Sequence, residues 1–300
     1  MFSSSYNTKI RKAELFTRIQ QDLPYTVSFA LQEDLGGITN AQADITAQLI
    51  PHQSKSTAVI ITRENGVFCG KNWFQEVFKQ LGGNINIHWQ VNDGDIIQAN
   101  QLLCNMIGST QILLTGERTA LNFIQTMSGV ASTVKRYADV LKHTKTKLLD
   151  TRKTLPGLRT AFKYAVLCGG GSNHRLGLTD GFLIKENHII AAGSIAKAVA
   201  NAIELRTHMS SNIPIEVEVE NLQELIQALE TKADIIMLDN FSYQDITRAV
   251  TITKQRILLE VSGNITLKNL PEYILMGIDY ISIGAFTKHV HALDLSMRLS

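Results

Sequence analysis

The sequence predicts an α/β protein in which a small antiparallel β unit precedes a closed or nearly closed (β/α) barrel. The main observation is that short apolar runs alternate with segments of helical periodicity between residues 148 and 283, as in parallel βα units. Polar residues follow the interior strands, and no GxGxxG motif follows the first of them. These two features favour a barrel over a doubly wound parallel sheet, which is the alternative architecture.

The N-terminal third predicts one long helix followed by the β unit. Apolar residues recur at helical spacing within residues 9–34, and Pro24 is expected to break this helix. From 55 to 107, apolar residues alternate around two turn signals, Asn65-Gly66 and Asp93-Gly94. This pattern is typical of short antiparallel strands.

A helical pattern over residues 111–141, with an expected break near Gly129, connects the β unit to the barrel. The predicted barrel strands are 148–149, 182–184, 215–219, 235–238, 257–261 and 280–283, and the predicted helices between them are 160–167, 192–209, 222–231, 243–254 and 267–276. We therefore expect an N-terminal α/β domain over 1–115, a catalytic barrel over 116–285, and a C-terminal segment over 286–300 that packs back on the N-terminal domain.

Length and composition exclude several classes of protein. The 300 residues, 44% apolar and 19% charged, are those of an ordinary globular protein with a sizeable core. Three cysteines, Cys69, Cys104 and Cys168, form no CxxC pair, which suits a reducing compartment and disfavours a zinc site. The sequence lacks both a long apolar run and a signal-peptide core, so we expect a cytoplasmic protein. A net charge of +2 predicts neither a nucleic-acid nor a membrane partner.

Positive charge is concentrated in one segment. Residues 150–188 carry six basic and three acidic side chains, a net charge of +3 in a chain whose total is +2. A run of charge is usually a solvated face. Here, however, Arg152 and Lys153 follow one predicted strand and Lys185 follows the next. Ligands of parallel α/β folds bind at that end of the strands, so these cations predict an anion site.

Other predicted strands end in acidic or small polar residues. Glu218 and Asp239 follow two middle strands, where they could hold Mg²⁺ against phosphates or diol hydroxyls. The last two strands end in small residues that suit a phosphate site: Ser262, Gly263, Asn264 and Gly284. Each of these residues taken alone is more often a helix cap, a turn or a surface partner. His289 and His291 have no third metal ligand nearby in sequence, and we interpret them as surface residues.

Eight segments, in order along nearly the whole chain, together resemble the quinolinate phosphoribosyltransferase family. They are EDLG, GERTALNFIQTMSGVAS, DTRKTLPGLR, GGGSNHRLGLTDGFLIKENHI, EVEVEN, MLDNF, EVSGNI and SIGAFTKHVHALDLSMR. The resemblance implies an N-terminal α/β sandwich-like domain, an incomplete (β/α) barrel of seven strands, and a homodimer. It also implies transfer of phosphoribosyl from phosphoribosyl pyrophosphate to quinolinate with Mg²⁺. The products would be nicotinate mononucleotide, CO₂ and pyrophosphate, as in NAD biosynthesis.

The resemblance also implies roles for particular residues. Those placed around the quinolinate carboxylates and neighbouring phosphates are Arg152, His174, Arg175 and Lys185. Lys153 would lie near the pyrophosphate and the reaction centre, and Glu218 and Asp239 would serve the ribose and the metal. Arg118 matches an arginine that the family inserts from the partner subunit. The 5′-phosphate cradle matches Ser262, Gly263, Asn264 and Gly284. Asn264 departs from the glycine of many members and would narrow the space there.

Three other functions are alternatives to this one. A lysine at a strand end, Lys185, is also what a Schiff-base aldolase would present. A non-catalytic protein binding RNA or a phosphorylated metabolite would need a basic stripe with interleaved aromatic residues, or lost catalytic acids, and the sequence has neither. The absence of GxxxxGK[ST] disfavours an ATPase.

Overall fold

A computed structural model describes residues 8–274 and 276–299. The expectation about a signal peptide falls partly on residues 1–7, which lie outside the described residues. The chain divides into two compact units. We call Arg136–Lys153 and Gly171–Ala285, with the described residues before Glu14, the parallel-sheet unit. The antiparallel-sheet unit holds Glu14–Lys135, Thr154–Gly170 and the described residues from Phe286 onward. The predicted domain limits stay a prediction.

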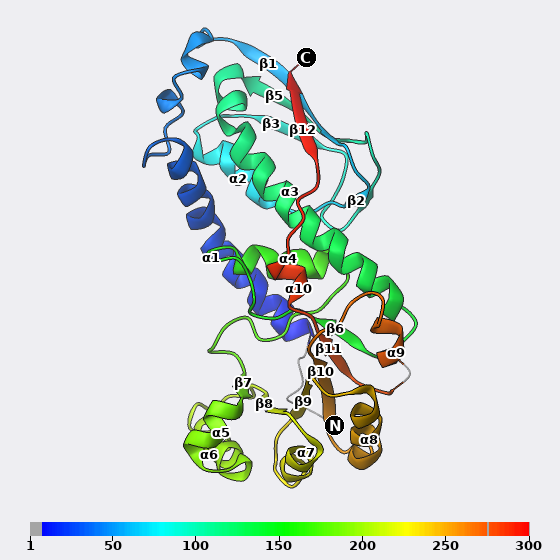
Figure 1. The fold of residues 1–300 in the computed structure, drawn as a ribbon. Coiled ribbons are helices and arrows are strands. Elements are labelled where there is room, and N and C mark those ends of the chain that lie inside the picture. Colours follow the sequence, from blue (N-terminus) through cyan, green and yellow to red (C-terminus); the bar gives the residue numbers. More distant parts are fainter. Residues whose placement is uncertain (1–7, 275, 300) are drawn as a thin grey trace. The chain divides into compact units, whose positions relative to one another are not determined.

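The antiparallel-sheet unit is built on four strands in the order β12-β1-β5-β3 (Figure 1). Their bounds are β1 Lys55–Thr62, β3 Asn86–Trp89, β5 Leu102–Ser109 and β12 Leu295–Leu299. A separate ribbon pairs β2 (Gly66–Val67) with β4 (Ile96–Ile97). The strands that the sequence predicts between 55 and 107 are therefore present, and the end of the chain supplies β12, which pairs with β1.

The described residues up to Leu141 form the helices α1 (Thr8–Asp34), α2 (Lys71–Gln80) and α3 (Thr110–Leu141), together with two short 3₁₀ turns, η1 (Ala41–Ala43) and η2 (Ala47–Leu49). The predicted break of α1 at Pro24 is wrong. The helix continues through the proline because Leu23, Val27 and Leu31 on either side are buried in one apolar stripe.

The predicted break of α3 near Gly129 is also wrong. The helix is continuous, and the glycine serves close packing instead of bending. A Cβ at this position would lie 1.8 Å from the carbonyl oxygen of His291. Only glycine allows the C-terminal segment to approach the helix that closely.

The parallel-sheet unit confirms the predicted fold class. Six parallel strands stand in the order β6-β11-β10-β9-β8-β7. Their bounds are β6 Lys147–Leu149, β7 Phe182–Ile184, β8 Ile215–Val219, β9 Ile235–Asp239, β10 Leu258–Ser262 and β11 Tyr280–Ser282. Within the described residues β6 and β7 are not paired, so the barrel is open, and this sheet has six strands where the resemblance implied seven. The doubly wound alternative is wrong.

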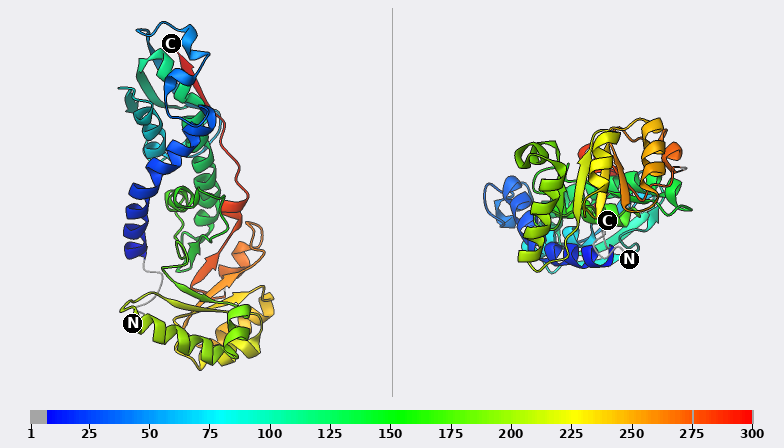
Figure 2. Two further views of the ribbon diagram at one scale, coloured as in Figure 1. Left: turned by 90° about the vertical axis from the view of Figure 1, so that its left-hand side faces the viewer. Right: turned by 90° about the horizontal axis from the view of Figure 1, so that it is seen from below.

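Helices cover the outside of this sheet. Its crossover helices are α5 (Glu186–Ala192), α6 (Ile195–His208), α7 (Leu222–Leu229), α8 (Tyr243–Thr253) and α9 (Leu270–Ile274), and α10 (Ala285–Lys288) follows the last of its strands. Figure 2 shows α6, α7 and α8 side by side along one face. The crossover helix α4 (Arg159–Cys168) belongs to the antiparallel-sheet unit. Among the described residues, no helix is both long and apolar enough for a membrane crossing.

Strand register sorts the side chains of the other face into rows. One row at the carboxyl ends of the strands holds Asp239, Ser262, Ser282 and Leu149, and the row below it holds Glu218, Met237, Glu260 and Tyr280. An apolar cluster of Leu149, Ile235, Tyr280 and Leu258 fills part of this face. Polar side chains are therefore concentrated toward the carboxyl ends of the strands, where parallel sheets bind ligands.

Candidate active site

A pocket of about 350 Å³ opens at the carboxyl ends of the parallel strands. Its lining residues all belong to the parallel-sheet unit: Thr151, Arg152, Lys153, His174, Arg175, Leu183, Lys185, Glu218, Met237, Asp239, Ser262 and Ser282. Eight of these were predicted as site residues from the sequence, and the structure brings them together; their individual roles stay predictions. A larger cavity in the antiparallel-sheet unit, about 540 Å³, has Glu33 and Asp34 as its charged lining residues, which does not suit an anionic ligand.

Arg152 and Lys153 enter the pocket from the segment that follows β6. The Nε atom of Arg152 is buried and has no hydrogen-bond partner among the described residues. A buried guanidinium donor without an acceptor is costly, so the arrangement favours a bound anion that would accept this hydrogen bond. The backbone N–H of Lys153 donates to the hydroxyl of Thr151 at 3.1 Å, which shapes the turn that carries both cations.

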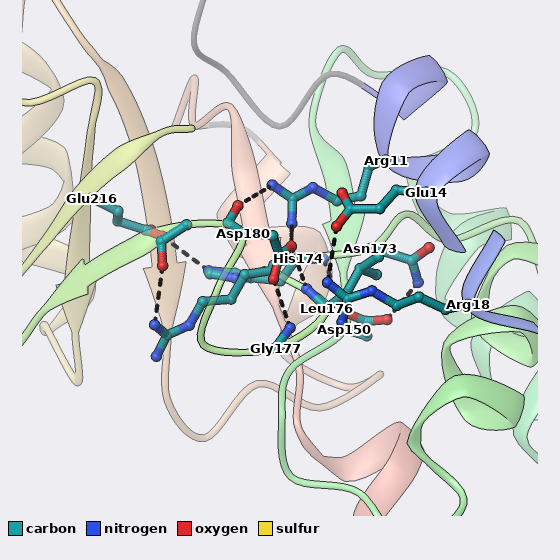
Figure 3. Close-up of polar contacts among 12 residues, drawn as sticks. Arg11, Glu14, Arg18, Asp150, Asn173, His174, Leu176, Gly177, Asp180 and Glu216 are labelled. Atoms are coloured by element: carbon teal, nitrogen blue, oxygen red, sulfur yellow. Dashed lines mark hydrogen bonds and ion pairs between the residues drawn. The ribbon is translucent and has the colours of Figure 1, made fainter. Parts of the chain in front are cut away.

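His174 and Arg175 lie on a loop that two buried aspartates hold in place (Figure 3). Asp150 accepts hydrogen bonds from Asn173 Nδ2 at 2.6 Å and from the backbone N–H of His174 at 2.9 Å. Asp180 accepts the backbone N–H groups of Leu176 and Gly177, both at 2.7 Å. Each carboxylate thus satisfies two loop donors, so the loop has a defined conformation without regular secondary structure.

Asp180 also forms a buried ion pair with Arg11, at the start of α1. The two side chains are 6% and 8% exposed, and Arg11 Nη2 donates a second hydrogen bond to the backbone oxygen of Asp180 at 3.1 Å. Arg11 and Asp180 are 169 positions apart in sequence. Sequence reasoning missed both residues, because neither belongs to a pattern that suggests a partner.

Lys185 and Glu218 form a direct ion pair within the pocket. Lys185 follows β7 and Glu218 lies on the neighbouring strand β8, so the parallel pairing of the two strands brings them together. Asp239, at the end of β9, accepts a hydrogen bond from Asn240 Nδ2 at 2.9 Å. The pocket therefore combines several cations with two carboxylates, the mixture predicted from the strand ends.

Of the four predicted phosphate-binding residues, one lines the pocket and three do not. Ser262 is a lining residue. Gly263 has a φ of +104°, and a Cβ there would lie 2.1 Å from Asn240 Oδ1, so the turn requires glycine. A Cβ on Gly284 would lie 2.8 Å from Lys153 Cδ. The exposed Asn264 side chain donates to Asn240 Oδ1 at 3.5 Å and is not a lining residue.

Arg118, the predicted contribution from a partner subunit, is on α3 in the antiparallel-sheet unit, and its side chain is exposed. Its neighbour Thr119 is buried and donates a hydrogen bond to Asp34 at 2.8 Å. The exposed arginine is therefore held on a well-anchored helix.

Three residues that sequence reasoning missed lie in or below the pocket floor. Glu216 and Glu260 are fully buried next to His174, and Ser282 lines the pocket with a hydroxyl that has no hydrogen-bond partner among the described residues. The alternation of side chains between the two faces of a strand is the sequence signal that could have identified the two glutamates. Glu216 shares a face with Glu218, and Glu260 shares one with Ser262.

Both parts of the chain match the same family of known proteins. Residues 44–128 match the family described as "Quinolinate phosphoribosyl transferase, N-terminal domain", and residues 130–298 match the corresponding C-terminal domain. A probable nicotinate-nucleotide pyrophosphorylase [carboxylating] of Bacillus subtilis is 39% identical over 265 residues, 88% of this chain and 89% of that protein. The Mycobacterium leprae nicotinate-nucleotide pyrophosphorylase [carboxylating] is 39% identical over 280 residues, 91% of this chain and 96% of that protein.

A solved structure shows the same likeness in three dimensions. The nicotinate-nucleotide pyrophosphorylase from Francisella tularensis superposes with a TM-score of 0.84 and 47% sequence identity, covering 92% of this chain and 97% of that one.

Proposed function

The chain belongs to the quinolinate phosphoribosyltransferase family, and we propose that the pocket at the strand ends is its active site. The enzyme transfers phosphoribosyl from phosphoribosyl pyrophosphate to quinolinate with decarboxylation, in NAD biosynthesis. The single observation that carries the placement is that cations and acids from well-separated parts of the chain line one pocket.

The basic side chains suit the charges of both substrates. Quinolinate has two carboxylates, and its co-substrate has a 5′-phosphate and a pyrophosphate, so the pocket must offer several fixed cations. Arg152 and Arg175 bind the quinolinate carboxylates, because a planar guanidinium can bind both oxygens of a carboxylate. His174 and Lys185 complete this group, and Lys153 lies beside the pyrophosphate. Ser262, Gly263, Asn264 and Gly284 surround the 5′-phosphate.

The acids stabilise charge that develops during the transfer. As the bond to pyrophosphate breaks, the ribose gains oxocarbenium character, which Glu218 or Asp239 stabilises electrostatically. The pyridine nitrogen of quinolinate then attacks the ribose. The resulting positive nitrogen accepts the electrons released when the adjacent carboxylate leaves as CO₂, so this step needs no organic cofactor.

The two acids also fit a magnesium ion. Mg²⁺ is usually bound by one or two carboxylates together with substrate phosphates. Glu218 and Asp239 line one pocket beside the cations that suit phosphate, and both are oxygen donors. These two residues would hold Mg²⁺, which would neutralise part of the charge of the departing pyrophosphate.

Two further features are part of the proposal. The enzyme is a homodimer in which each active site receives Arg118 from the other subunit, as supported by the exposure of this arginine on α3. It works in the cytoplasm, as supported by three cysteines that are all free thiols.

The test is formation of nicotinate mononucleotide and CO₂ from quinolinate and phosphoribosyl pyrophosphate, with nicotinate as a competing substrate. We expect both products in equal amounts and none from nicotinate. Turnover of nicotinate alone would overturn the substrate assignment. In the aldolase alternative, borohydride would trap a carbonyl substrate on Lys185; we expect no trapping, because this ammonium group pairs with Glu218.

A further inference from the structure

Three ionisable side chains meet next to the pocket, in the interior of the parallel-sheet unit. His174 Nε2 lies 3.0 Å from Glu216 Oε2 and 3.6 Å from Glu260 Oε2. His174 is 4% exposed, and both glutamates are fully buried. They lie beside an apolar cluster, so little solvent is available to stabilise charge. The transfer reaction as described makes no use of either glutamate.

The hydrogen bonds of His174 define its protonation. The backbone N–H of Arg175 donates to His174 Nδ1 at 2.7 Å, so Nδ1 carries a lone pair and no proton. The ring proton is therefore on Nε2, which faces Glu216 (Figure 3). This donor lies closer to Glu216 than to Glu260, so it serves Glu216.

Of the two glutamates, Glu260 is the one expected to be uncharged. Neither of its oxygens accepts a hydrogen bond among the described residues, and the nearby Ser282 hydroxyl lowers its pKa less than burial raises it, so an ionised carboxylate would be poorly compensated. Burial, and next the nearby Glu216, raise the pKa of Glu260 well above its usual range. The other polar groups that face it are His174 from the loop, Glu218 from β8, and Tyr280 and Ser282 from β11.

We propose that Glu260 is a positioning residue that acts as a neutral carboxylic acid. Its proton is donated to Glu216, Glu216 accepts the Nε2–H of His174, and Nδ1 of His174 holds the backbone of Arg175 at the pocket. This inference rests on the proposed function, because Arg175 is assigned there to quinolinate. It goes further by giving His174 an orienting role toward Arg175 and by placing a proton-carrying acid next to His174.

Stability against pH tests the protonation directly. The pKa of Glu260 is higher in the folded than in the unfolded chain, so folding takes up a proton between those two values. Stability therefore falls as pH rises from the ordinary glutamate range toward the pKa of the folded state. Glu260→Gln keeps a hydrogen-bond donor and cannot ionise, so it removes this fall. Glu204→Gln, at an exposed position on α6, is the matched control.

The measurement is the melting temperature of the unliganded enzyme and the two variants from pH 5.5 to 8.5. We expect the melting temperature of Glu260→Gln, relative to wild type, to rise by about 3 °C or more across this range. Glu204→Gln should stay within about 1 °C of wild type at every pH, because its pair with His208 is exposed and weak. A difference for Glu260→Gln that does not change with pH overturns the proposal. So does stoichiometric metal in the purified enzyme that Glu260→Gln loses, because a cation would then balance the carboxylates.

Kinetics test the positioning role. Glu260→Gln should keep the KM for quinolinate within about threefold of wild type, whereas Glu260→Leu, which cannot donate, should raise it about tenfold with a smaller change in kcat. An unchanged KM in folded Glu260→Leu contradicts the role. If Glu260→Leu does not fold, the melting temperatures of wild type and Glu260→Gln against pH still test whether Glu260 is protonated. Absence of any product from wild type would instead refute the proposed function and leave the melting result valid.

Discussion

The ion pair between Arg11 and Asp180 is predicted to hold the substrate-binding loop, and Arg11→Ala tests this. Asp180 accepts two backbone N–H groups of the loop and also pairs with Arg11. Removing the guanidinium leaves the carboxylate, only 6% exposed, without its charged partner. Breaking a buried ion pair in this way costs about 3 to 5 kcal/mol.

Asp180→Ala should lower the free energy of unfolding by at least as much as Arg11→Ala. It removes the charged partner of the Arg11 guanidinium and also the acceptor of the backbone N–H groups of Leu176 and Gly177. Each unsatisfied buried group costs about 1 to 3 kcal/mol of stability. The double variant should cost less than the sum of the two single changes, because no unpaired charge is left behind. Arg248→Ala is the control, since Arg248 and Asp245 form an exposed pair at 3.4 Å; we expect a loss below about 1 kcal/mol.

The assay is urea unfolding of each variant, followed by the KM for quinolinate in those that remain folded. We expect this KM to rise in Arg11→Ala, because the loop that it anchors carries His174 and Arg175. Two results would refute the reasoning. One is a loss in the free energy of unfolding for the double variant that equals the sum of the two single losses. The other is a loss for Arg11→Ala that is no larger than the loss for Arg248→Ala.

Three more outcomes are expected. Arg118→Ala and Arg152→Ala should each lose about nine-tenths or more of the activity, but an equal mixture after subunit exchange should regain about a quarter of wild-type activity, since half of the dimers then carry one intact site. Confirmed heterodimers without activity would exclude a shared site. Gly129→Ala should lower stability by about 3 kcal/mol or more in thermal unfolding, because its Cβ would meet a carbonyl oxygen at 1.8 Å; an unchanged melting temperature contradicts this. Chelation should abolish turnover and added Mg²⁺ restore it; activity in chelator would rule out the metal.

Sequence reasoning could predict those parts of the fold that depend on short-range patterns. The six parallel strands follow from apolar runs, and their carboxyl ends follow from the polar residues after them. Because parallel strands share one direction, the residues after them must meet at one edge of the sheet, and Lys185 and Glu218 do so.

Features decided by distant contacts were not predicted. Pro24 remains inside α1 because the packing of Val27 and Leu31 outweighs the missing hydrogen bond. The C-terminal segment was expected to pack back on the N-terminal domain, but not to add strand β12 to a sheet whose other strands end at Ser109 or earlier. Glu216 and Glu260 were not predicted because they lie two residues before the strand ends, although the alternation of side chains along a strand places them on the same face as Glu218 and Ser262.

The most direct test of the central claim compares two identical substitutions at opposite ends of the same sheet. Arg152 lines the pocket after β6, whereas Arg256 lies just before β10, at the amino ends of the strands, and is exposed. If quinolinate is bound and converted in this pocket, Arg152→Ala should reduce kcat/KM for quinolinate by about 10- to 100-fold, with Arg256→Ala within about twofold of wild type. Equal values for the two variants would contradict the account.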